Sequence, residues 1–430
     1  MSSRSKMITC LLASALAVTG SPVVASPASA AEPSQVDLHL EAATKDALGA
    51  QELVDTYRKY SCFEVEDPAV RDEYRAGKGV RVPLTQVFDD LWYIGDEYVG
   101  QYILKTANGG FALLDTLNNS SEVMTYTLPA LKSLGMGPQH PLEGAFLSHG
   151  HEDHDGGAAQ LRAVFGPDLP IYLGSADATG KTYAPKLIDS ANPQPQTVTI
   201  GGSTIVAQSV PGHTPGSLVA LIPVHQNGAR QLMLLNGRAG IPDTVEGSRQ
   251  YLEGTERAYR LAQEHGATGT IHTHPLSDGS TGHMNAIRDA GTRDPNPFVM
   301  GTEKTLRAAA IWRECAAARA AQVDPAATIP VWRTTATEIL DARPFTTRLS
   351  ARVSSGWGTS AGQSVTFDVN GAGGCTAVTD ESGIAWCESA VPLLPKQTLS
   401  ATFDGNRTAE YMNLPSVGSD RVPAPRGDAG

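Results

Sequence analysis

What the 430-residue sequence lacks most is positive charge, since 33 Lys and Arg stand against 45 Asp and Glu, for a formal net charge of −12. A protein that binds nucleic acid needs a basic surface to displace counterions, so this balance argues against nucleic acid as a partner. The sequence also lacks an apolar run of the ~20 residues that a membrane-spanning helix requires. We therefore expect neither nucleic-acid binding nor a transmembrane segment.

The apolar run that is present lies at the start of the chain. Arg4 and Lys6 precede an apolar stretch over residues 7–18, and Ala28-Ser29-Ala30 follows it. This order of basic, apolar and small residues is typical of a secretory signal peptide. We expect cleavage after Ala30 and a secreted protein, either extracellular or in the cell envelope. The mature chain then keeps 31 basic and 45 acidic residues, a formal charge of −14.

Cysteine is also scarce, with five in the chain. Cys10 lies in the predicted signal peptide, so four remain, and an even number in an oxidising compartment suggests disulfides. Two of the four are close in sequence and share a small C-terminal region, which favours their pairing. The other two then pair by elimination. The expected disulfides are Cys375 with Cys387 and Cys62 with Cys315.

The hydrophobic pattern divides the rest of the chain into an α/β part and an all-β part. Short strands alternate with helices over about 87–321, which predicts sheets covered by helices. Beyond Pro344, alternation with a period of two and Gly-rich turns predict a small β-sandwich. The expected divisions are a signal peptide (1–30), a leader with a helix over about 41–60 that packs on the main domain (31–80), the main domain (81–340), the β-sandwich (345–417) and a disordered tail (418–430).

One short segment carries four groups that can bind a metal. His149, His151, Asp153 and His154 follow a predicted strand directly and precede Gly156-Gly157 at a helix start. Imidazole nitrogens and a carboxylate are the ligands that zinc prefers, but one loop cannot complete two four-coordinate sites by itself. The sequence therefore predicts further ligands elsewhere in the chain.

Distant histidines in suitable settings are few. His213 lies in Gly212-His213-Thr214-Pro215-Gly216, and His272 and His274 lie in Ile271-His272-Thr273-His274-Pro275. A single histidine is more often a surface or core residue than a ligand. Together with the first loop, however, they occupy predicted strand ends and loops of one domain, as a two-metal site requires.

These motifs resemble the metallo-β-lactamase superfamily over about 87–321. The resemblance depends on Leu113-Leu114-Asp115-Thr116, the H-x-H-x-D-H loop, the Gly-His-Thr-Pro-Gly segment and a final His-Pro. It implies an α/β fold of the αββα type and two zinc ions. It implies that Asp115 orients ligands and that Asp153 also acts in catalysis by orienting the attacking water. The implied ligands are His149, His151 and His213 for the first zinc and Asp153, His154 and His274 for the second, with His272 as the alternative last ligand.

The chain departs from many hydrolases of that family at one position. Where they place an aspartate that bridges both metals, this chain has Asn236, so it is most similar to the lactamase subclass that uses neither cysteine nor a bridging aspartate there. Arg238 follows two residues later, and a guanidinium matches the geometry of a carboxylate. We expect Asn236 and Arg238 to contact substrate, with a plain surface arginine as the alternative for Arg238.

The function that this resemblance implies is zinc-dependent hydrolysis of a small acyl compound. Cleavage of an amide or ester bond is expected, with β-lactams as the most specific substrate class and lactones, esters or thioesters as the alternative. The C-terminal region, with Cys375 and Cys387, resembles the bacterial immunoglobulin-like domains of exported proteins. A second hypothesis is therefore a surface-binding protein with a structural zinc site, in which the C-terminal domain contacts a cell surface or polymer.

Overall fold

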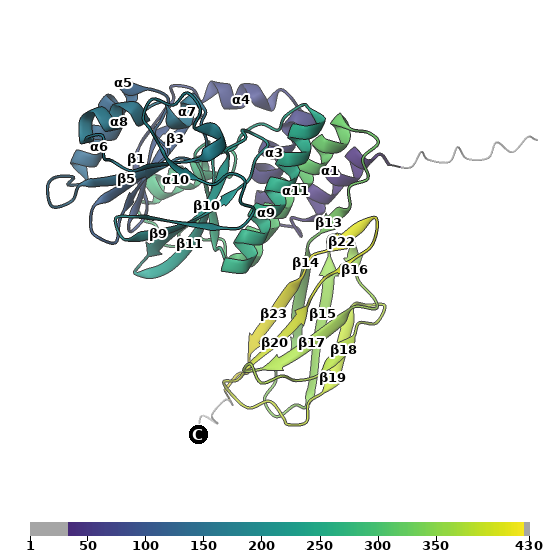
Figure 1. The fold of residues 1–430 in the computed structure, drawn as a ribbon. Helices are drawn as coiled ribbons and strands as arrows, with labels where there is room; N and C mark the ends of the chain where they lie inside the picture. Colours follow the sequence, from purple (N-terminus) through teal and green to yellow (C-terminus); the bar gives the residue numbers. More distant parts are fainter. Residues whose placement is uncertain (1–32, 425–430) are drawn as a thin grey trace, which may run out of the picture. The chain divides into compact units, whose positions relative to one another are not determined.

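The computed structural model describes residues 33–424 and is shown in Figure 1. The predicted signal peptide over residues 1–30, with Cys10, lies outside these residues. Within residues 33–424, none of the helices combines the length and the apolar composition of a membrane-spanning helix.

A seven-stranded sheet forms the first half of the main domain, and its strands lie side by side in sequence order. The first four strands form an antiparallel meander, whereas the last four are parallel to one another. The parallel strands place their carboxyl ends at the same edge of the sheet. The strands are β1 (Arg81–Phe88), β2 (Leu91–Asp96), β3 (Gly100–Lys105), β4 (Phe111–Leu114), β5 (Leu142–Phe146), β6 (Ile171–Gly174) and β7 (Lys186–Ile188).

A five-stranded sheet follows, in the order β12-β11-β10-β9-β8. Its strands are antiparallel except β11 and β12, which are parallel because the 21-residue helix α9 (Val245–His265) connects them. The strands are β8 (Gln196–Ile200), β9 (Ser203–Ser209), β10 (Leu218–Gln226), β11 (Ala229–Asn236) and β12 (Gly269–His272).

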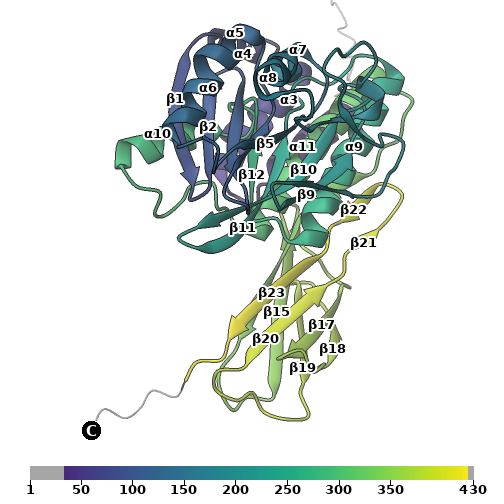
Figure 2. The same ribbon diagram turned by 60° about the vertical axis from the view of Figure 1, so that its left-hand side comes forward.

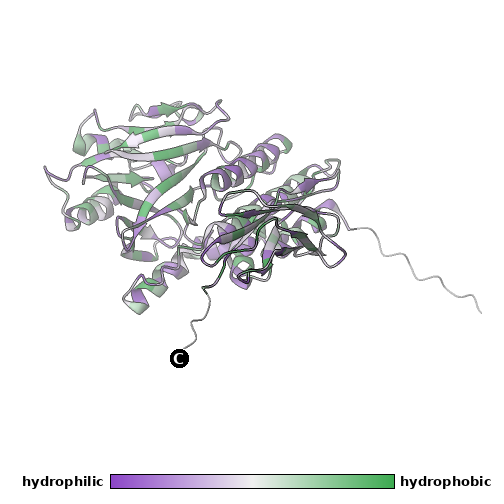
Figure 3. Cartoon of the chain, turned by 90° about the horizontal axis from the view of Figure 1, so that it is seen from below, coloured by the Kyte–Doolittle hydropathy of each residue, from purple (hydrophilic) through white to green (hydrophobic). Residues whose placement is uncertain are grey.

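The two sheets pack face to face because their strands carry apolar side chains on both faces. On β10, Leu218 and Ala220 belong to the core between the sheets, whereas Val219 and Leu221 belong to the core under the helices. This alternation follows from the two-residue period of a strand. Figure 3 shows hydrophobic residues concentrated along these strands, while the helices carry both hydrophobic and hydrophilic residues.

Helices cover the outer face of each sheet, as Figures 1 and 2 show. Several of those over the first sheet contribute to one apolar core, and those over the second sheet contribute to another. The predicted αββα sandwich is therefore confirmed. The first group is α5 (Ser120–Glu122), the π-helical turn η2 (Val123–Thr127), α6 (Leu128–Ser133), α7 (Glu152–Asp155) and α8 (Ala158–Phe165); the second is α1 (Gln35–Lys45), α9 and α11 (Thr302–Val323), while α10 (Ser280–Ala290) follows β12.

The N-terminal segment is more broken than the single predicted helix over 41–60. The first helix ends at Lys45, and the chain turns where Leu48 and Gly49 both have positive φ, a region that favours glycine. A disulfide between Cys62 and Cys315 then joins α3 to α11. The remaining helices here are α2 (Gln51–Leu53), the π-helical turn η1 (Val54–Arg58), α3 (Lys59–Glu66) and α4 (Val70–Ala76).

The C-terminal region is all β, and its two four-stranded sheets enclose a core that includes Leu349, Val365 and Phe367. The second expected disulfide, Cys375–Cys387, is also present. The immunoglobulin-like identity of this unit stays a prediction. Its strands are β14 (Thr335–Asp341), β15 (Arg348–Ser355), β16 (Gly358–Thr359), β17 (Ser364–Val369), β18 (Thr376–Val378), β19 (Ile384–Glu388), β20 (Thr398–Phe403) and β23 (Ser416–Arg421), and a small further sheet contains β13 (Val331–Arg333), β21 (Asn406–Arg407) and β22 (Tyr411–Asn413).

The C-terminal β unit begins earlier and ends later in the sequence than expected. The β-sandwich was expected over 345–417, but β14 begins at Thr335 and pairs with β15. The expectation of disorder after Val417 is wrong for residues 418–421, since they belong to β23, which pairs with β20. Ladder hydrogen bonds join backbone groups, so a polar strand can pair without the apolar side chains that a composition argument looks for.

The two disulfides should differ in their effect on stability. Cys62 and Cys315 are 253 residues apart, whereas Cys375 and Cys387 are 12 apart. Because a cross-link restricts the unfolded chain more when its loop is longer, we expect loss of the first to cost about 5 kcal/mol and loss of the second about 3 kcal/mol. Urea unfolding of the two double Cys→Ser variants measures the difference, and an equal or reversed order would contradict it.

Candidate metal centre

The histidine loop lies where β5 passes into α7. Only the five residues 147–151 separate Phe146 from Glu152, so the chain turns within a few residues and several side chains face the same space. His149 and His154 are buried, Asp153 is partly buried and His151 is exposed. The loop therefore has ligand atoms both at the bottom of the site and at its solvent side.

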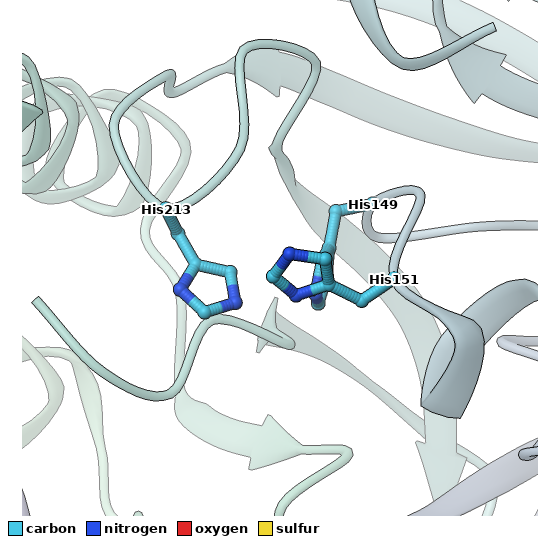
Figure 4. A group of neighbouring side chains, drawn as sticks. All are labelled: His149, His151 and His213. Carbon is cyan, nitrogen blue, oxygen red and sulfur yellow. The ribbon is translucent and has the colours of Figure 1, made fainter. Parts of the chain in front are cut away.

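The first group of candidate ligands is His149, His151 and His213. Their ligand atoms all lie within 4.8 Å of one another, and His149 Nε2 is 3.1 Å from His151 Nδ1. Figure 4 shows the three rings facing a common space, with His213 coming from the loop between β9 and β10. Three imidazoles from two loops thus converge, as one metal ion would require.

The second group shares the same loop. Ligand atoms of His149, Asp153 and His154 also lie within 4.8 Å of one another. His274, two residues after β12, places its Nε2 3.1 Å from Nε2 of His154. Asp153 Oδ2 lies 3.6 Å from each of these two nitrogens, so its carboxylate stands between the rings.

Each buried ring of these groups has its other nitrogen held by the protein. His213 Nδ1 donates to the carbonyl of Gly240 at 3.0 Å, and His274 Nδ1 donates to the carbonyl of Tyr98 at 2.7 Å. A carbonyl oxygen can only accept, so Nδ1 carries the proton and the lone pair of Nε2 points into the site. Such outer partners orient metal-binding histidines.

Asp115, directly after β4, holds the remaining part of the site. Its carboxylate accepts hydrogen bonds from the Ser148 backbone at 2.7 Å, from Ser148 Oγ at 2.8 Å and from His154 Nδ1 at 2.7 Å. Ser148 Oγ in turn is 3.1 Å from Nδ1 of His149. Asp115 is fully buried and has a φ of 63°, which is uncommon for a residue other than glycine. Asp115 therefore contacts His154 directly and His149 through Ser148.

Burial sets the charge of the rings. Burial and the neighbouring imidazoles lower the pKa of His213 to about 3 and that of His274 to about 4, and they hold the pKa of His149 well below its ordinary value. For His154, burial opposes the charge, but the Asp115 carboxylate outweighs it and raises the pKa. At neutral pH, His149, His213 and His274 are therefore uncharged and have a free lone pair for a metal.

His272, the alternative last ligand, lies elsewhere. Its Nδ1 accepts the backbone N–H of His274 at 2.9 Å, and its ring centroid is 6.3 Å from that of Trp312 on α11. The structure thus brings His274, and not His272, to Asp153 and His154.

Asn236 and Arg238 are hydrogen-bonded to each other. Asn236 Oδ1 accepts the backbone N–H of Arg238 at 3.1 Å and its Nε–H at 3.2 Å. The guanidinium lies 4.6 Å from the ring centroid of Tyr251, and Arg238 is only 2% exposed. Arg238 is therefore not a surface residue, and its contact with a substrate stays a prediction.

Asp177 contacts both ligand loops and was not expected from the sequence. It lies in the 3-10 turn η3 (Ser175–Asp177) after β6 and accepts hydrogen bonds from Gly150, Thr214 and Gly216. No motif surrounds it, and its partners are 27 to 39 residues away in the sequence. Only the folded chain reveals this contact.

Comparison with known proteins finds curated relatives that match only part of the chain. No family model matches the chain. It is similar to the hydroxyacylglutathione hydrolase of Yersinia pestis, with 36% identity over 90 residues, which are 21% of this chain and 33% of that protein. The hydroxyacylglutathione hydrolase of Shewanella halifaxensis is 39% identical over 82 residues, 19% of this chain and 30% of that protein. The matched segment thus spans about a third of the length of these relatives.

Solved structures with a similar fold are metallo-β-lactamases. The Rm3 metallo-β-lactamase has a TM-score of 0.43 and 17% identity, covering 54% of this chain and 93% of that one. A subclass B3 metallo-β-lactamase of Bradyrhizobium japonicum has a TM-score of 0.41 and 20% identity, covering 54% and 92%. The chain is thus similar to metallo-β-lactamases over about half of its length and to hydroxyacylglutathione hydrolases over about a fifth of it.

Proposed function

We propose that this protein is a hydrolase that uses two zinc ions to cleave an amide or ester bond in a small acyl compound. The observation that carries the proposal is the convergence of two groups of ligand atoms at the histidine loop, with Asp153 between His154 and His274. A purely structural zinc site is filled by protein ligands, whereas catalytic sites keep a position open for water or substrate.

The donor set fits zinc. It consists of imidazole nitrogens and one carboxylate, with no thiolate, and this combination suits zinc better than the oxygen-rich sites of calcium or magnesium. The rings with a lowered pKa need not lose a proton to bind at neutral pH. In this proposal His149, His151 and His213 hold the first ion, and Asp153, His154 and His274 hold the second.

When bound, such ions supply a water that ionises near neutral pH and a Lewis acid that polarises the substrate carbonyl. The chain itself supplies orientation and proton transfer. Burial opposes ionisation of Asp153, but His154 and His274 outweigh it and lower the pKa of this carboxyl group, so it is charged at neutral pH. Its side chain is 24% exposed, so its oxygens can accept a hydrogen bond from the attacking water and take up the proton.

Two substrate classes have separate support. The resemblance to the lactamase subclass without a bridging aspartate supports β-lactams, since the position of that aspartate is Asn236, whose Oδ1 accepts hydrogen bonds from Arg238. The similarity to hydroxyacylglutathione hydrolases supports a thioester instead. Both reactions attack an acyl carbonyl, so the same side chains would serve either substrate.

We also propose that the protein is exported. The support is the basic, apolar and small-residue order over residues 1–30 and the two disulfides, which persist in oxidising compartments. A contact of the C-terminal β unit with a cell surface or polymer stays a prediction.

The proposal predicts that activity depends on Asp153. Purified mature protein should contain close to two zinc ions per chain by elemental analysis and should hydrolyse a chromogenic cephalosporin or an S-acylglutathione. Because Asp153→Asn keeps the shape but cannot accept the proton, kcat should fall about 100- to 10,000-fold. Glu152→Gln, which changes the exposed neighbour of Asp153, is the matched control and should keep full activity.

The results of these assays test the substrate class and the metal binding separately. Turnover of the cephalosporin alone supports a lactamase, and turnover of the thioester alone supports the second substrate class. Two zinc ions without either reaction would move the search to lactones and other esters. A protein that binds no metal would overturn the proposed function.

Stability of the metal-free protein should depend on pH through the buried rings. Since the pKa of His213 is about 3 and that of His274 about 4 in the folded state, the unfolded chain binds protons first as the pH falls below 6.5. The contribution of the two rings to the free energy of unfolding is complete above pH 6.5. It is lost as the pH falls, toward pH 4 for His274 and toward pH 3 for His213, by about 1.4 kcal/mol per pH unit for each ring. Urea unfolding with a chelator present should show this slope, and His213→Asn should reduce it by about 1.4 kcal/mol per pH unit. An unchanged slope in the variant would contradict the assignment.

A further inference from the structure

Asp177 accepts three hydrogen bonds from two separate loops. Its Oδ2 accepts from the backbone N–H of Gly150 at 2.8 Å and from Thr214 Oγ1 at 2.6 Å, and its Oδ1 accepts from the backbone N–H of Gly216 at 2.7 Å. Hydrogen bonds to a carboxylate are stronger than those between neutral groups. One side chain thus joins the loop after β5 to the loop between β9 and β10.

The donors belong to the parts of these loops that carry the first group of ligands. Gly150 stands between His149 and His151, and Thr214 directly follows His213. Asp177 has no hydrogen bond in the structure to Asp153, His154 or His274. Its contacts are therefore selective for one of the two groups.

Gly150 and Gly216 lie so close to Asp177 that neither position has room for a side chain. A Cβ atom at Gly150 would lie 2.8 Å from Cβ of Asp177, and one at Gly216 would lie 2.6 Å from its Cγ. Contacts this short force something to shift, so both loops need glycine where they meet the carboxylate. The glycines of the two motifs are thereby explained by Asp177, which neither motif contains.

Lys181, four residues after Asp177, binds the same histidine loop through the backbone carbonyl of Gly150. Its Nζ donates to the carbonyl of Gly150 at 2.5 Å and pairs with Asp155 Oδ2 at 2.6 Å, and Tyr183 donates to that same oxygen at 2.8 Å. Gly150 therefore has both its N–H and its C=O bound by the segment after β6. This segment supports the histidine loop on both sides.

Asp115 differs from Asp177 in the rings that it supports. It contacts His154 directly and reaches His149 through Ser148, so its carboxylate supports rings of both groups. Asp177, in comparison, supports only the first group. The two buried or partly buried carboxylates should therefore have different effects on the two metals.

We propose that Asp177 is a positioning residue that holds the loops of His149, His151 and His213 at the separation that one metal ion needs. The inference depends on the proposed two-metal function. Ligands must be held within about 0.5 Å of their working positions, and the three hydrogen bonds of Asp177 supply that constraint between two otherwise independent loops. Loss of the carboxylate weakens binding of the first metal and leaves the second metal in place.

The test is Asp177→Asn. The amide has one acceptor oxygen in place of two, so at least one buried loop group loses its acceptor while the volume stays the same. Zinc titration of the full mature chain with 15N-labelled histidine separates the sites, because the Nδ1–H of His213 reports the first metal and that of His274 reports the second. We expect zinc binding at the first site to weaken about 10- to 100-fold and binding at the second to change by less than about threefold.

Two further variants serve as references. Asp189→Asn makes the same substitution directly after β7, where the carboxylate accepts a hydrogen bond from Ala191 in its own turn, and it should change neither site. Asp115→Asn should weaken both sites. Equal weakening of both sites by Asp177→Asn, or none at either, would overturn the positioning role.

A second measurement distinguishes failure of this inference from failure of the proposed function. Hydrogen exchange of the Gly150 and Gly216 amides in the metal-free protein should be faster in Asp177→Asn than in the unchanged chain or in Asp189→Asn. If the unchanged protein binds no zinc, the proposed function fails, but faster exchange would still support the link between the loops. Unchanged exchange would overturn the link itself.

Discussion

The candidate metal centre depends on holding uncharged imidazole rings in contact with one another. The ring centroid of His149 lies 4.7 Å from that of His213. Protonated rings at such distances repel, and burial adds to the cost of each charge. Neutral rings can approach, but each then has one donor and one acceptor nitrogen, and the proton must lie on the outer one. The arrangement is therefore determined by the groups around the rings as much as by the rings.

The fold meets this requirement at strand ends. Asp115 follows β4, Gly240 follows β11, and Tyr98 lies in the turn between β2 and β3. Two of these three partners act through a backbone carbonyl, so any residue at those positions could provide it. Both sheets thus contribute to one edge where the histidine loop, the loop of His213 and the end of β12 meet.

The difference between the ligand side chains and the groups that hold them explains what the sequence could predict. The loop from His149 to His154 was predictable because its ligands are adjacent and its spacing is distinctive, and the αββα layers follow from strands that are apolar on both faces. The outer partners were harder to predict. A backbone carbonyl such as that of Gly240 has no side-chain signature, and Asp177 becomes meaningful only after folding brings it to Gly150 and Gly216.

Two expectations failed for a related reason. The alternative of a surface position for Arg238 is wrong, because its buried guanidinium lies over Tyr251 and donates to the carbonyl of Val210 at 3.4 Å. Disorder is expected after Val417 because of the composition, but residues 418–421 extend an existing sheet through backbone hydrogen bonds. In both cases a partner distant in sequence decided the outcome.

The N-terminal helices are connected to the same centre although they provide no candidate ligand. The disulfide joins Cys62 on α3 to α11, and two residues later the carboxylate of Glu64 accepts the backbone N–H of Ile241 at 2.7 Å. Ile241 adjoins Gly240, whose carbonyl holds His213. The disulfide, the short stretch of α3 from Cys62 to Glu64, two hydrogen bonds and one peptide unit therefore connect α11 to a candidate metal ligand. Because a ring is oriented only as well as its partner is held, this segment belongs to the support of the metal centre and is more than a leader that packs on the domain.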